Sequence, residues 1–333
     1  MSQEVQTVLI FRALKMGDML CSLPALRALR QTFPKAKITL VSHPAMKNLF
    51  CRYPHYIDEF VSFPGFPGLP ESSCDAEQSL QFIKTIQDQK YDLAIQLHGS
   101  GELSNPLVKL FNAKKTVGFY RRADNFCPDS DYFIPYPENL SEVHRCLKVM
   151  TIFSEEKWDE DIEFPLWPQD NRILIGELQR QSIFIERPYF CIHPGASTET
   201  KRWAPEKFAA ISDYLVTKGF QVAFTGSAPE SLLVSRIQRM MKHDSLNIAA
   251  LDLTIGALAA FIHHSRGLIC NDTGVSHLAS ALRKPSLVIF SETDPGRWAP
   301  INKNRHRSLV RPEVEEVIDE LKAFLMEDLE EVI

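Results

Sequence analysis

The chain has 333 residues, of which 44% are hydrophobic and 24% are charged, and its net charge at pH 7 is -5. This composition is that of a folded globular protein, and the length exceeds what one hydrophobic core usually supports, so we expect two domains. The negative net charge argues against a general nucleic-acid-binding protein. Two basic clusters, Lys303–Arg307 and Lys114, Lys115, Arg121 and Arg122, suit either an anionic ligand or a solvated face.

The cysteines and the apolar runs bear on the compartment. The seven cysteines are scattered and include no CxxC pair, which indicates a reducing compartment rather than a disulfide framework or a zinc site. No apolar run approaches the length of a membrane span, and the first seven residues lack the pattern of a signal peptide. We therefore expect a cytoplasmic protein, with peripheral contact at the inner membrane surface left as an open alternative.

The first half of the chain alternates apolar runs with helical or irregular stretches. Helical spacing at Leu20, Leu23, Leu26 and Leu29 follows the first run, and Pro24 marks either a kink or the start of a regular helix near Leu23. Strands are expected at Val8–Phe11, Ile38–Val41, Phe60–Phe63, Leu93–Leu97 and Val117–Phe119, and a helix at Glu142–Phe153. The Pro- and Gly-rich segment Phe63–Pro70 is interpreted as a surface loop, and Phe164–Pro168 as an inter-domain linker.

The same alternation restarts after the linker. Strands are expected at Tyr189–Ile192, Val222–Thr225, Leu268–Cys270 and Leu287–Phe290, with helices near Pro205–Thr217, Pro229–Met241, Ile255–His264 and Val275–Leu282, and an amphipathic helix at Glu313–Met326. The pattern predicts an α/β protein with two doubly wound, Rossmann-like domains facing each other across a cleft, with ligands at the carboxyl ends of the strands. The absence of a GxGxxG motif argues against a nicotinamide enzyme.

Three turns in the second half each place a glycine and a hydroxyl residue after an expected strand. They are His193–Ser197, Thr225–Ala228 and Asn271–Gly274. The last of these opens a helix, whose first N–H groups attract phosphate, and His277 would stand one turn further on. Three such turns in one parallel domain indicate a site for a nucleotide diphosphate, and the nearby Lys201 supplies a cation. The alternative is an ordinary capped turn with a core-facing histidine and a solvated lysine.

Five segments together resemble the signature blocks of glycosyltransferase family 9, the heptosyltransferases of lipopolysaccharide core synthesis. They read FRALKMGDMLCSLPALRALR, IHPGASTETKRWAPEKF, TGSAPE, NDTGVSHLASAL and FSETDPGRWAP, in this order along the chain. The resemblance implies a GT-B fold with an acceptor domain at residues 1–166 and a nucleotide-sugar domain at residues 167–310. Residues 311–333 are then expected to form a helix that packs back onto the first domain.

The resemblance also implies an activity and a set of site residues. The activity is inverting transfer of a heptose, without metal or other cofactor, from a nucleotide-diphosphate donor such as ADP-heptose to a sugar hydroxyl of a glycan or glycolipid acceptor. Asp18 matches the general base and Lys201 a lysine that contacts the donor phosphate. The donor-binding residues implied are Gly195, Ser197, Gly226, Glu230, Leu253, Asp272, Thr273, Gly274 and His277, and the acceptor-binding residues are Arg12, Lys15, His144 and Arg145.

Several alternatives stay open at this point. Asp18 is also a suitable helix cap, and the acidic triplets Asp129-Ser130-Asp131 and Asp159-Glu160-Asp161 are interpreted as solvated acids rather than metal ligands. The family has small hydroxyl residues where this chain has Ala13, Leu14 and Lys15, and Glu142–Arg145 resembles a less characterised branch, so the sugar and the acceptor are open. A nucleotide-sugar epimerase and a non-catalytic nucleotide-sugar-binding protein are the competing functions.

Overall fold

The computed structural model describes residues 5–70, 74–121 and 132–330, and it divides into two compact units, Met1–Ile162 and Glu163–Ile333. Arg122 and the triplet Asp129-Ser130-Asp131 lie outside the described residues. The boundary precedes the one expected at residue 166, because the buried Phe164 belongs to the second unit. Its N–H donates to the carbonyl of Ala281 at 3.2 Å.

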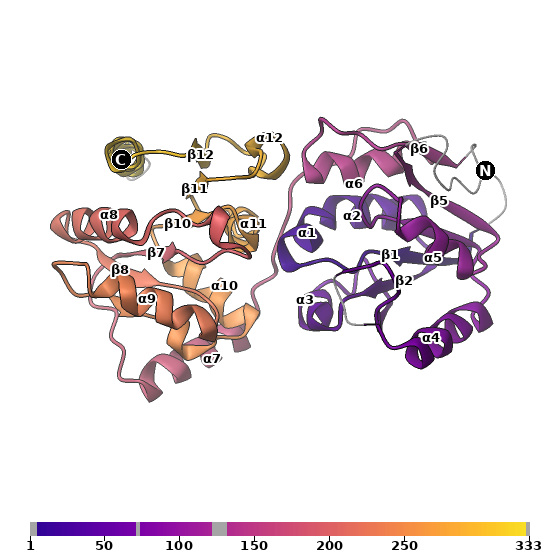
Figure 1. The fold of residues 1–333 in the computed structure, drawn as a ribbon, viewed down its shortest axis with the longest axis horizontal. Helices are drawn as coiled ribbons and strands as arrows, with labels where there is room; N and C mark the ends of the chain where they lie inside the picture. The colour runs from indigo at the N-terminus through magenta and orange to yellow at the C-terminus, as the bar shows by residue number, and fades with distance from the viewer. Residues whose placement is uncertain (1–4, 71–73, 122–131, 331–333) are drawn as a thin grey trace. The chain divides into compact units, whose positions relative to one another are not determined.

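The first unit is built on a six-stranded sheet in the order β3-β2-β1-β4-β5-β6, with every pair parallel. Its elements are β1 (Thr7–Phe11), α1 (Met16–Cys21), α2 (Leu23–Thr32), β2 (Lys37–Ser42), α3 (Lys47–Phe50), β3 (Glu59–Ser62), α4 (Ala76–Asp88), β4 (Leu93–Gln96), α5 (Ser104–Leu110), β5 (Lys115–Tyr120), β6 (Phe133–Pro135) and α6 (Glu142–Met150). Helices α2 and α6 lie on one face of this sheet, and α4 and α5 lie on the other (Figure 1).

The second unit repeats this architecture, with a parallel sheet in the order β12-β11-β10-β7-β8-β9. Its elements are α7 (Pro168–Arg180), β7 (Tyr189–His193), α8 (Pro205–Thr217), β8 (Gln221–Phe224), α9 (Ser231–Gln238), β9 (Leu246–Asn247), α10 (Ile255–His264), β10 (Gly267–Asn271), α11 (Gly274–Ala281), β11 (Ser286–Phe290), α12 (Pro295–Trp298), β12 (His306–Val310) and α13 (Val314–Glu330). In each unit the strand order reverses beside the first strand. The carboxyl ends of β1 and β4, and of β7 and β10, are therefore the expected ligand-binding positions.

The predicted doubly wound α/β architecture is confirmed, and so are the predicted strands. The strands β6, β9 and β12 and the helices α3, α4, α5, α7 and α12 were not predicted from the sequence. These three strands lie at sheet edges or are very short, and β12 has alternating exposure, so they lack the continuous apolar run that marks a central strand. Strand β12 begins at His306, so it includes the last two residues of the basic cluster Lys303–Arg307.

Two local predictions have clear outcomes in the first unit. Helix α2 begins at Leu23 with Pro24 in its first turn, where the missing N–H of proline would have no helical partner anyway. The segment Phe63–Pro70 is irregular as expected, but it is not simply a surface loop. Phe63 and Leu69 are buried in the core under α4 and α5, and the ring of Phe63 packs edge-on against Phe11 at 5.0 Å.

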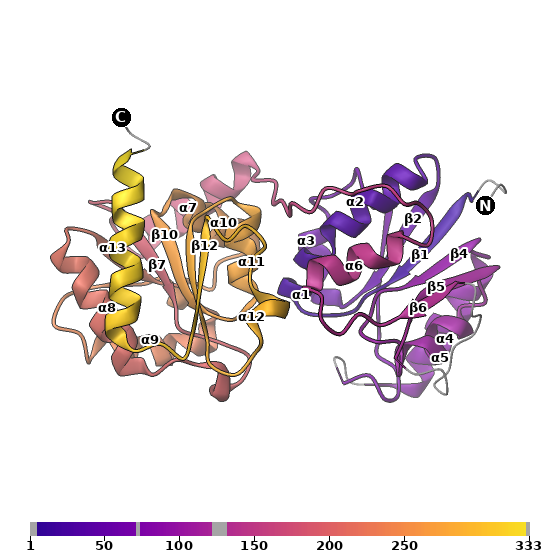
Figure 2. The same cartoon turned by 90° about the horizontal axis from the view of Figure 1, so that it is seen from above.

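Helix α13 packs on α8 of its own unit, as both views of the fold show (Figures 1 and 2). Val317 and Leu321 are fully buried in the core of that unit. The segment before the helix is fixed as well, because Trp203 Nε1 donates to the carbonyl of Pro312 at 2.9 Å. Within the second unit the buried side of the helix is covered by α8. The expected packing of residues 311–333 on the first domain stays a prediction.

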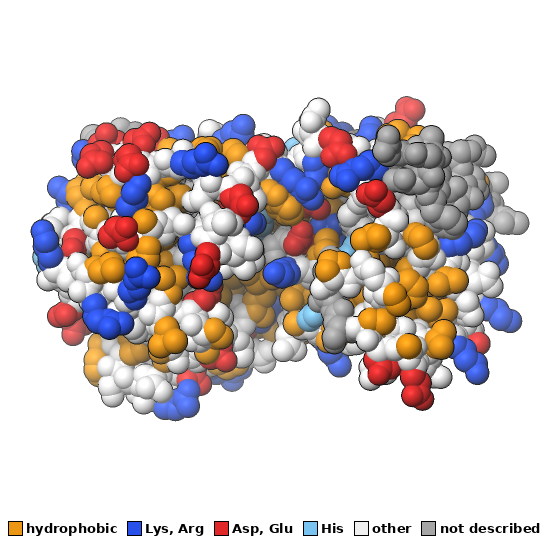
Figure 3. Space-filling model, in the orientation of Figure 1, with side chains coloured by type: hydrophobic (Ala, Val, Ile, Leu, Met, Phe, Trp, Pro, Cys, Tyr) orange, Lys and Arg blue, Asp and Glu red, His pale blue; other side chains and the backbone are white. Residues whose placement is uncertain are grey.

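The viewed face of the first unit carries a gathering of apolar side chains over α4 and α5 (Figure 3). Leu80 on α4 is 69% exposed, and Leu103 and Leu110 at the two ends of α5 are also exposed. Among the described residues, no helix combines the length and the apolar character needed to cross a membrane.

A buried histidine fixes the edge strand β12 to β11. His306 Nδ1 lies 2.8 Å from Ser286 Oγ, and His306 is 3% exposed. Burial lowers the pKa of His306 to about 4, and Arg305 and His277 act in the same direction. Between its ordinary pKa and this value, the unfolded chain binds a proton that the folded chain does not, so stability falls as the pH is lowered through this window.

We expect this group to remove about 3 kcal/mol of unfolding free energy between pH 7 and pH 4, at roughly 1.4 kcal/mol for each unit of pKa difference. His306→Gln retains a hydrogen-bonding group for Ser286 but does not titrate. Urea unfolding of the variant should therefore lose less stability over this range than the unsubstituted protein. Equal losses in the two proteins would contradict the assignment.

Candidate functional site

In the second unit, Asn271 links the ends of the two strands where the strand order reverses. It is the last residue of β10 and is fully buried. Its Nδ2 donates to the carbonyl of Pro194, just after β7, at 2.8 Å, and its Oδ1 accepts from the N–H of Trp203 at 2.9 Å. The turn after β7 and the Lys201–Trp203 segment are therefore held against the end of β10 by one side chain.

The carboxylate of Asp272 follows directly and gathers side chains from two other loops. Asp272 Oδ2 accepts a hydrogen bond from Lys201 Nζ at 3.3 Å and another from Thr293 Oγ1 at 2.5 Å. Asp272 is buried, whereas the Lys201 side chain is 24% exposed. Because the ion pair is long and the Lys201 side chain is partly exposed, its ammonium group can bind a further anion.

Helix α11 begins beside this carboxylate with its N-terminus unprotected by a side chain. Thr273 is the N-cap, but its side chain makes no capping hydrogen bond. The alternative of an ordinary side-chain cap therefore does not describe this turn. The first N–H groups of α11, starting at Gly274, have no partner within the helix and suit an anion.

His277 lies one turn into α11 and is 4% exposed. Its burial agrees with the alternative that His277 faces the core, and His306 is one of its neighbours. Ser197, in the turn after β7, is exposed, and Leu253, which precedes α10, is half-buried. These three predicted donor-binding residues thus differ widely in accessibility.

The carboxylate of Glu230 connects the turns after β7 and β8. Glu230 Oε2 accepts from both the N–H and the hydroxyl of Ser227 at 2.8 Å. A Cβ atom placed on Gly195 would lie 1.9 Å from Glu230 Oε1, and one on Gly226 would lie 3.2 Å from Glu230 Cβ. Both glycines therefore lie against this side chain, and a methyl group at Gly195 would displace the Glu230 carboxylate. Behind it, His193 Nδ1 lies 3.1 Å from Thr225 Oγ1.

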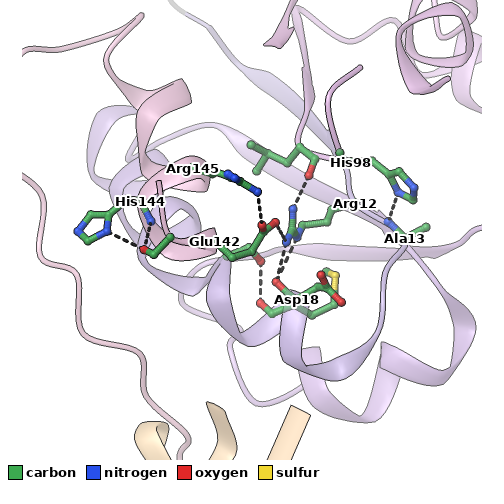
Figure 4. Close-up of polar contacts among 12 residues, drawn as sticks. Arg12, Ala13, Asp18, His98, Glu142, His144 and Arg145 are labelled. Carbon is green, nitrogen blue, oxygen red and sulfur yellow. Dashed lines mark hydrogen bonds and ion pairs between the residues drawn. The ribbon is translucent and has the colours of Figure 1, made fainter. Parts of the chain in front are cut away.

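In the first unit, the buried guanidinium of Arg12 occupies the corresponding position, between the ends of β1 and β4 (Figure 4). It donates to the carbonyl of Leu97, after β4, at 2.5 Å and to the carbonyl of Asp18, in α1, at 2.9 Å. The next residue, Ala13, donates its N–H to His98 Nδ1 at 3.1 Å, and the His98 ring stacks on Phe11. If the His98 ring is neutral, this bond places its proton on Nε2.

Glu142 and Arg145 of α6 complete this cluster. Glu142 Oε1 accepts from Arg12 at 3.0 Å, and Glu142 Oε2 lies 3.5 Å from an Arg145 nitrogen. Arg145 also donates to the carbonyls of Pro137 and Glu138 and to the hydroxyl of Tyr136. Arg12 and Arg145 were predicted to bind an acceptor. Both are instead buried and bound to protein groups, so their guanidinium groups do not face solvent.

The other predicted residues of the first unit are more accessible. Asp18 lies in the first turn of α1 and is half-buried, and its side chain is not the N-cap, because α1 is capped at Lys15 without a side-chain bond. Lys15 is exposed. His144 is 37% exposed and lies between Ser141 Oγ, at 2.6 Å, and Glu160 Oε2, at 3.0 Å.

The structure also brings forward residues that sequence reasoning did not select. His98 lies two residues after β4 and Thr293 three residues after β11, and Asn271, which the sequence analysis named only as part of its turn, ends β10. A signal was available for them, because each is a polar residue at the carboxyl end of an apolar run. Within residues 5–70, 74–121 and 132–330, no group of three or more His, Cys, Asp or Glu side chains is arranged to hold a metal ion.

Comparisons with known protein families, characterised proteins and solved structures all point to the same family. The model of one family, glycosyltransferase family 9 (heptosyltransferase), matches residues 79–321, which is more than half of the chain. Among characterised proteins, the chain is 24% identical over 296 residues to lipopolysaccharide heptosyltransferase 3 of Escherichia coli, covering 86% of this chain and 84% of that protein.

Two solved structures are similar over nearly the whole chain. One is a glycosyltransferase family 9 protein from Veillonella parvula, with a TM-score of 0.82 and 18% identity, covering 98% of this chain and 99% of the other. The other is the ADP-heptose lipopolysaccharide heptosyltransferase II of E. coli, with a TM-score of 0.77 and 19% identity, covering 97% and 99%. At these identities the structural likeness establishes the fold, which is GT-B.

The contact between Glu230 and Gly195 predicts a cost for adding a methyl group. In Gly195→Ala the new Cβ would force the Glu230 carboxylate away from Ser227, so we expect the unfolding free energy to fall by about 1 to 3 kcal/mol. Gly176→Ala is the matched control, since nothing lies within 4 Å of its Cβ position in α7 and alanine favours a helix. Chemical denaturation should show a loss for the first variant and none for the second; equal stabilities would refute the contact.

Proposed function

The chain belongs to glycosyltransferase family 9, and we propose that it is an inverting, metal-independent enzyme that transfers a heptose from ADP-heptose to a sugar hydroxyl of a lipopolysaccharide-core-like acceptor. The observation that carries this proposal is the meeting of three turns at the ends of β7, β8 and β10. They bring Gly195, Glu230 and Asp272 together beside the open N-terminus of α11.

The donor diphosphate needs positive charge and N–H donors, and this end of the sheet offers both. The first turn of α11 supplies N–H groups, and the partly exposed side chain of Lys201 supplies an ammonium group beside Asp272. Asp272 and Thr293 would keep Lys201 close in the absence of donor. The carboxylate of Glu230 is suited to accept hydrogen bonds from the hydroxyls of a ribose, and the half-buried Leu253 to contact a nucleobase.

The acceptor has to lose a proton as its hydroxyl attacks the anomeric carbon, and we assign this proton to Asp18. It is a half-buried carboxylate next to the end of β1, and its side chain does not cap α1. An inverting transfer needs only this one base if the diphosphate leaves as an anion that Lys201 and the α11 N-terminus stabilise. The exposed Lys15 and the partly exposed His144 are the residues we propose for acceptor contact.

A lipid-linked acceptor would bring the enzyme to a membrane from the cytoplasm. The exposed Leu80, Leu103 and Leu110 over α4 and α5 support peripheral contact as part of this proposal (Figure 3).

The competing functions differ in what they require: an epimerase converts donor without an acceptor, and a non-catalytic protein binds donor without converting it. Incubation with a panel of nucleotide sugars, with and without core oligosaccharide, should give acceptor-dependent release of ADP from ADP-heptose.

Removal of divalent metal should leave turnover unchanged. The diphosphate charge would be met by Lys201 and by backbone N–H groups, so no metal is needed to stabilise the leaving group. The measurement is the rate in EDTA and after addition of magnesium. A rate that vanishes in EDTA and returns with magnesium would rule out the metal-independent mechanism.

Thr273→Ala should weaken the affinity for ADP by about 1 to 3 kcal/mol while leaving stability nearly unchanged. The hydroxyl is available to the diphosphate because it makes no capping bond to α11. Asp75→Ala is the opposite control: its carboxylate caps α4 through the N–H of Gln78, so stability should fall by about 1 kcal/mol with ADP affinity unchanged. Calorimetry and thermal unfolding of both variants test this, and unaltered ADP affinity in Thr273→Ala would exclude the hydroxyl from the site.

Asp18→Asn should lower kcat by about 10²- to 10⁴-fold, the range for loss of a general base. Asparagine is nearly isosteric, and the hydrogen bonds from Arg12 go to the backbone carbonyl of residue 18, so folding and ADP affinity should be retained. Steady-state kinetics and calorimetry provide the two readouts. Normal turnover by a folded Asp18→Asn protein would exclude this residue as the base.

A further inference from the structure

We propose that Arg12 and Glu142 are positioning residues that hold the turn carrying Asp18 and maintain the charge balance around its carboxylate. This inference rests on the proposed role of Asp18 as the base. It assigns Arg12 a function through its contacts with the protein in place of the predicted contact with an acceptor. The residues labelled in Figure 4 all belong to the first unit.

The backbone of Asp18 is held from outside its own helix. In a regular helix the carbonyl of Asp18 would accept from the N–H of Ser22, but that N–H donates to Met19 at 3.1 Å because α1 ends there. Arg12 supplies the donors instead, from Nε at 3.2 Å and from Nη2 at 2.9 Å. Two donors on one carbonyl fix both the position and the direction of this peptide group.

The same guanidinium is fixed at its other side. Nη1 donates to the carbonyl of Leu97 after β4, and Nη2 also donates to Glu142 Oε1 at 3.0 Å. Arg12 is 2% exposed, so it has no freedom to turn toward solvent. The Asp18 turn is thereby tied to β4 and to α6, two elements that are far from it in sequence.

Glu142 is the counterion that makes burial of Arg12 possible. An unpaired buried guanidinium would be strongly unfavourable, and Glu142 itself is 5% exposed. Arg145 approaches the second Glu142 oxygen and is itself held by the carbonyl of Pro137 and stacked over the ring of Tyr136 at 4.9 Å. The chain of contacts therefore runs from α6 through Glu142 and Arg12 to the backbone of Asp18.

Charge also couples these groups. Burial by itself lowers the pKa of Arg12, but the acidic groups around it, Cys146, Glu142 and Asp18, together raise that pKa above its ordinary value. The attraction is mutual, so the positive charge of Arg12 acts on the Asp18 carboxylate as well. Burial raises the pKa of the Cys146 thiol to about 12, so this thiol is uncharged at neutral pH. The charged α6 side chains in the cluster around Arg12 are then Glu142 and Arg145.

The first test is Arg12→Lys against Arg30→Lys. Arg30 is an internal match, since it also donates to two backbone carbonyls, of Ala36 and Tyr56, and to a carboxylate, Asp58, but it lies at the end of α2. Lysine keeps the charge but cannot reach three groups at once. We expect kcat with ADP-heptose and core oligosaccharide to fall about 10- to 100-fold in Arg12→Lys, with donor KM within about twofold, and to stay within about twofold in Arg30→Lys.

Hydrogen exchange gives a readout that needs no turnover. Amides of residues 16–22 should exchange faster in Arg12→Lys than in Arg30→Lys, because only the first variant loses the bonds to the Asp18 carbonyl. Equal exchange over residues 16–22 and equal kcat in the two folded variants would overturn the proposal. If Arg12→Lys does not fold, Glu142→Gln provides the test that follows.

The pH dependence separates a positioning role from a merely structural one. Glu142→Gln removes a negative charge near Asp18 but keeps an acceptor for Arg12, so the acid limb of kcat/KM should move to lower pH. Arg12→Met should move it to higher pH. An acid limb that does not move in Glu142→Gln would overturn the electrostatic part of the proposal.

The double variant Arg12→Lys/Asp18→Asn separates this proposal from the role of Asp18. If Arg12 acts through Asp18, the double variant should be no slower than Asp18→Asn alone. Additive losses would show that Arg12 acts elsewhere and would overturn the positioning role. A fully active Asp18→Asn protein would instead refute Asp18 as the base, while the exchange experiment would still decide whether Arg12 holds the turn.

Discussion

The reversal of strand order in each sheet is the constraint on which the rest of this structure depends. Connections leave β1 and β4, and likewise β7 and β10, toward opposite faces, so the backbone ladder of the sheet ends there and side chains take part in joining the loops that follow. A buried polar side chain takes part in this connection in each unit. Arg12 reaches from the end of β1 to the carbonyl of Leu97, and Asn271 reaches from β10 to the carbonyl of Pro194. The residues that follow these strands, including Asp272, owe their positions to these connections.

The two units nevertheless present their charges in different ways. In the first unit, Arg12 and Arg145 are buried and bound to carbonyls and to Glu142, which makes the cluster rigid. Buried ion pairs add little net stability, so rigidity is the better explanation for such a costly arrangement. In the second unit, Lys201 stays partly exposed, with a single long contact to Asp272. One cluster holds a backbone turn in place, and the other keeps a cation available.

Much of the fold was predictable because its central strands are buried on both faces and read as apolar runs, as Val8–Phe11 and Leu287–Phe290 do. Edge strands such as β12 carry polar residues on one side, so they do not form apolar runs and were not predicted. The turns of the second unit were predictable because glycine and hydroxyl residues follow strands there. The burial of Arg12 was not, since arginine is rarely buried and its partner Glu142 is distant in sequence. The role of Asp18 remains a prediction.

The position of α13 has a consequence for how the chain acquires its structure during synthesis. The first unit is continuous in sequence, so it is complete once residue 162 has left the ribosome. The second unit cannot close its core until Val317 and Leu321 are present, and Trp203 lacks its bond to Pro312 until then. We therefore expect the Lys201–Trp203 segment to be among the last parts of the chain to become ordered, well after the turn of Asp18 has formed. In a nascent chain, the turn that carries the proposed base would thus be in place well before the proposed nucleotide site.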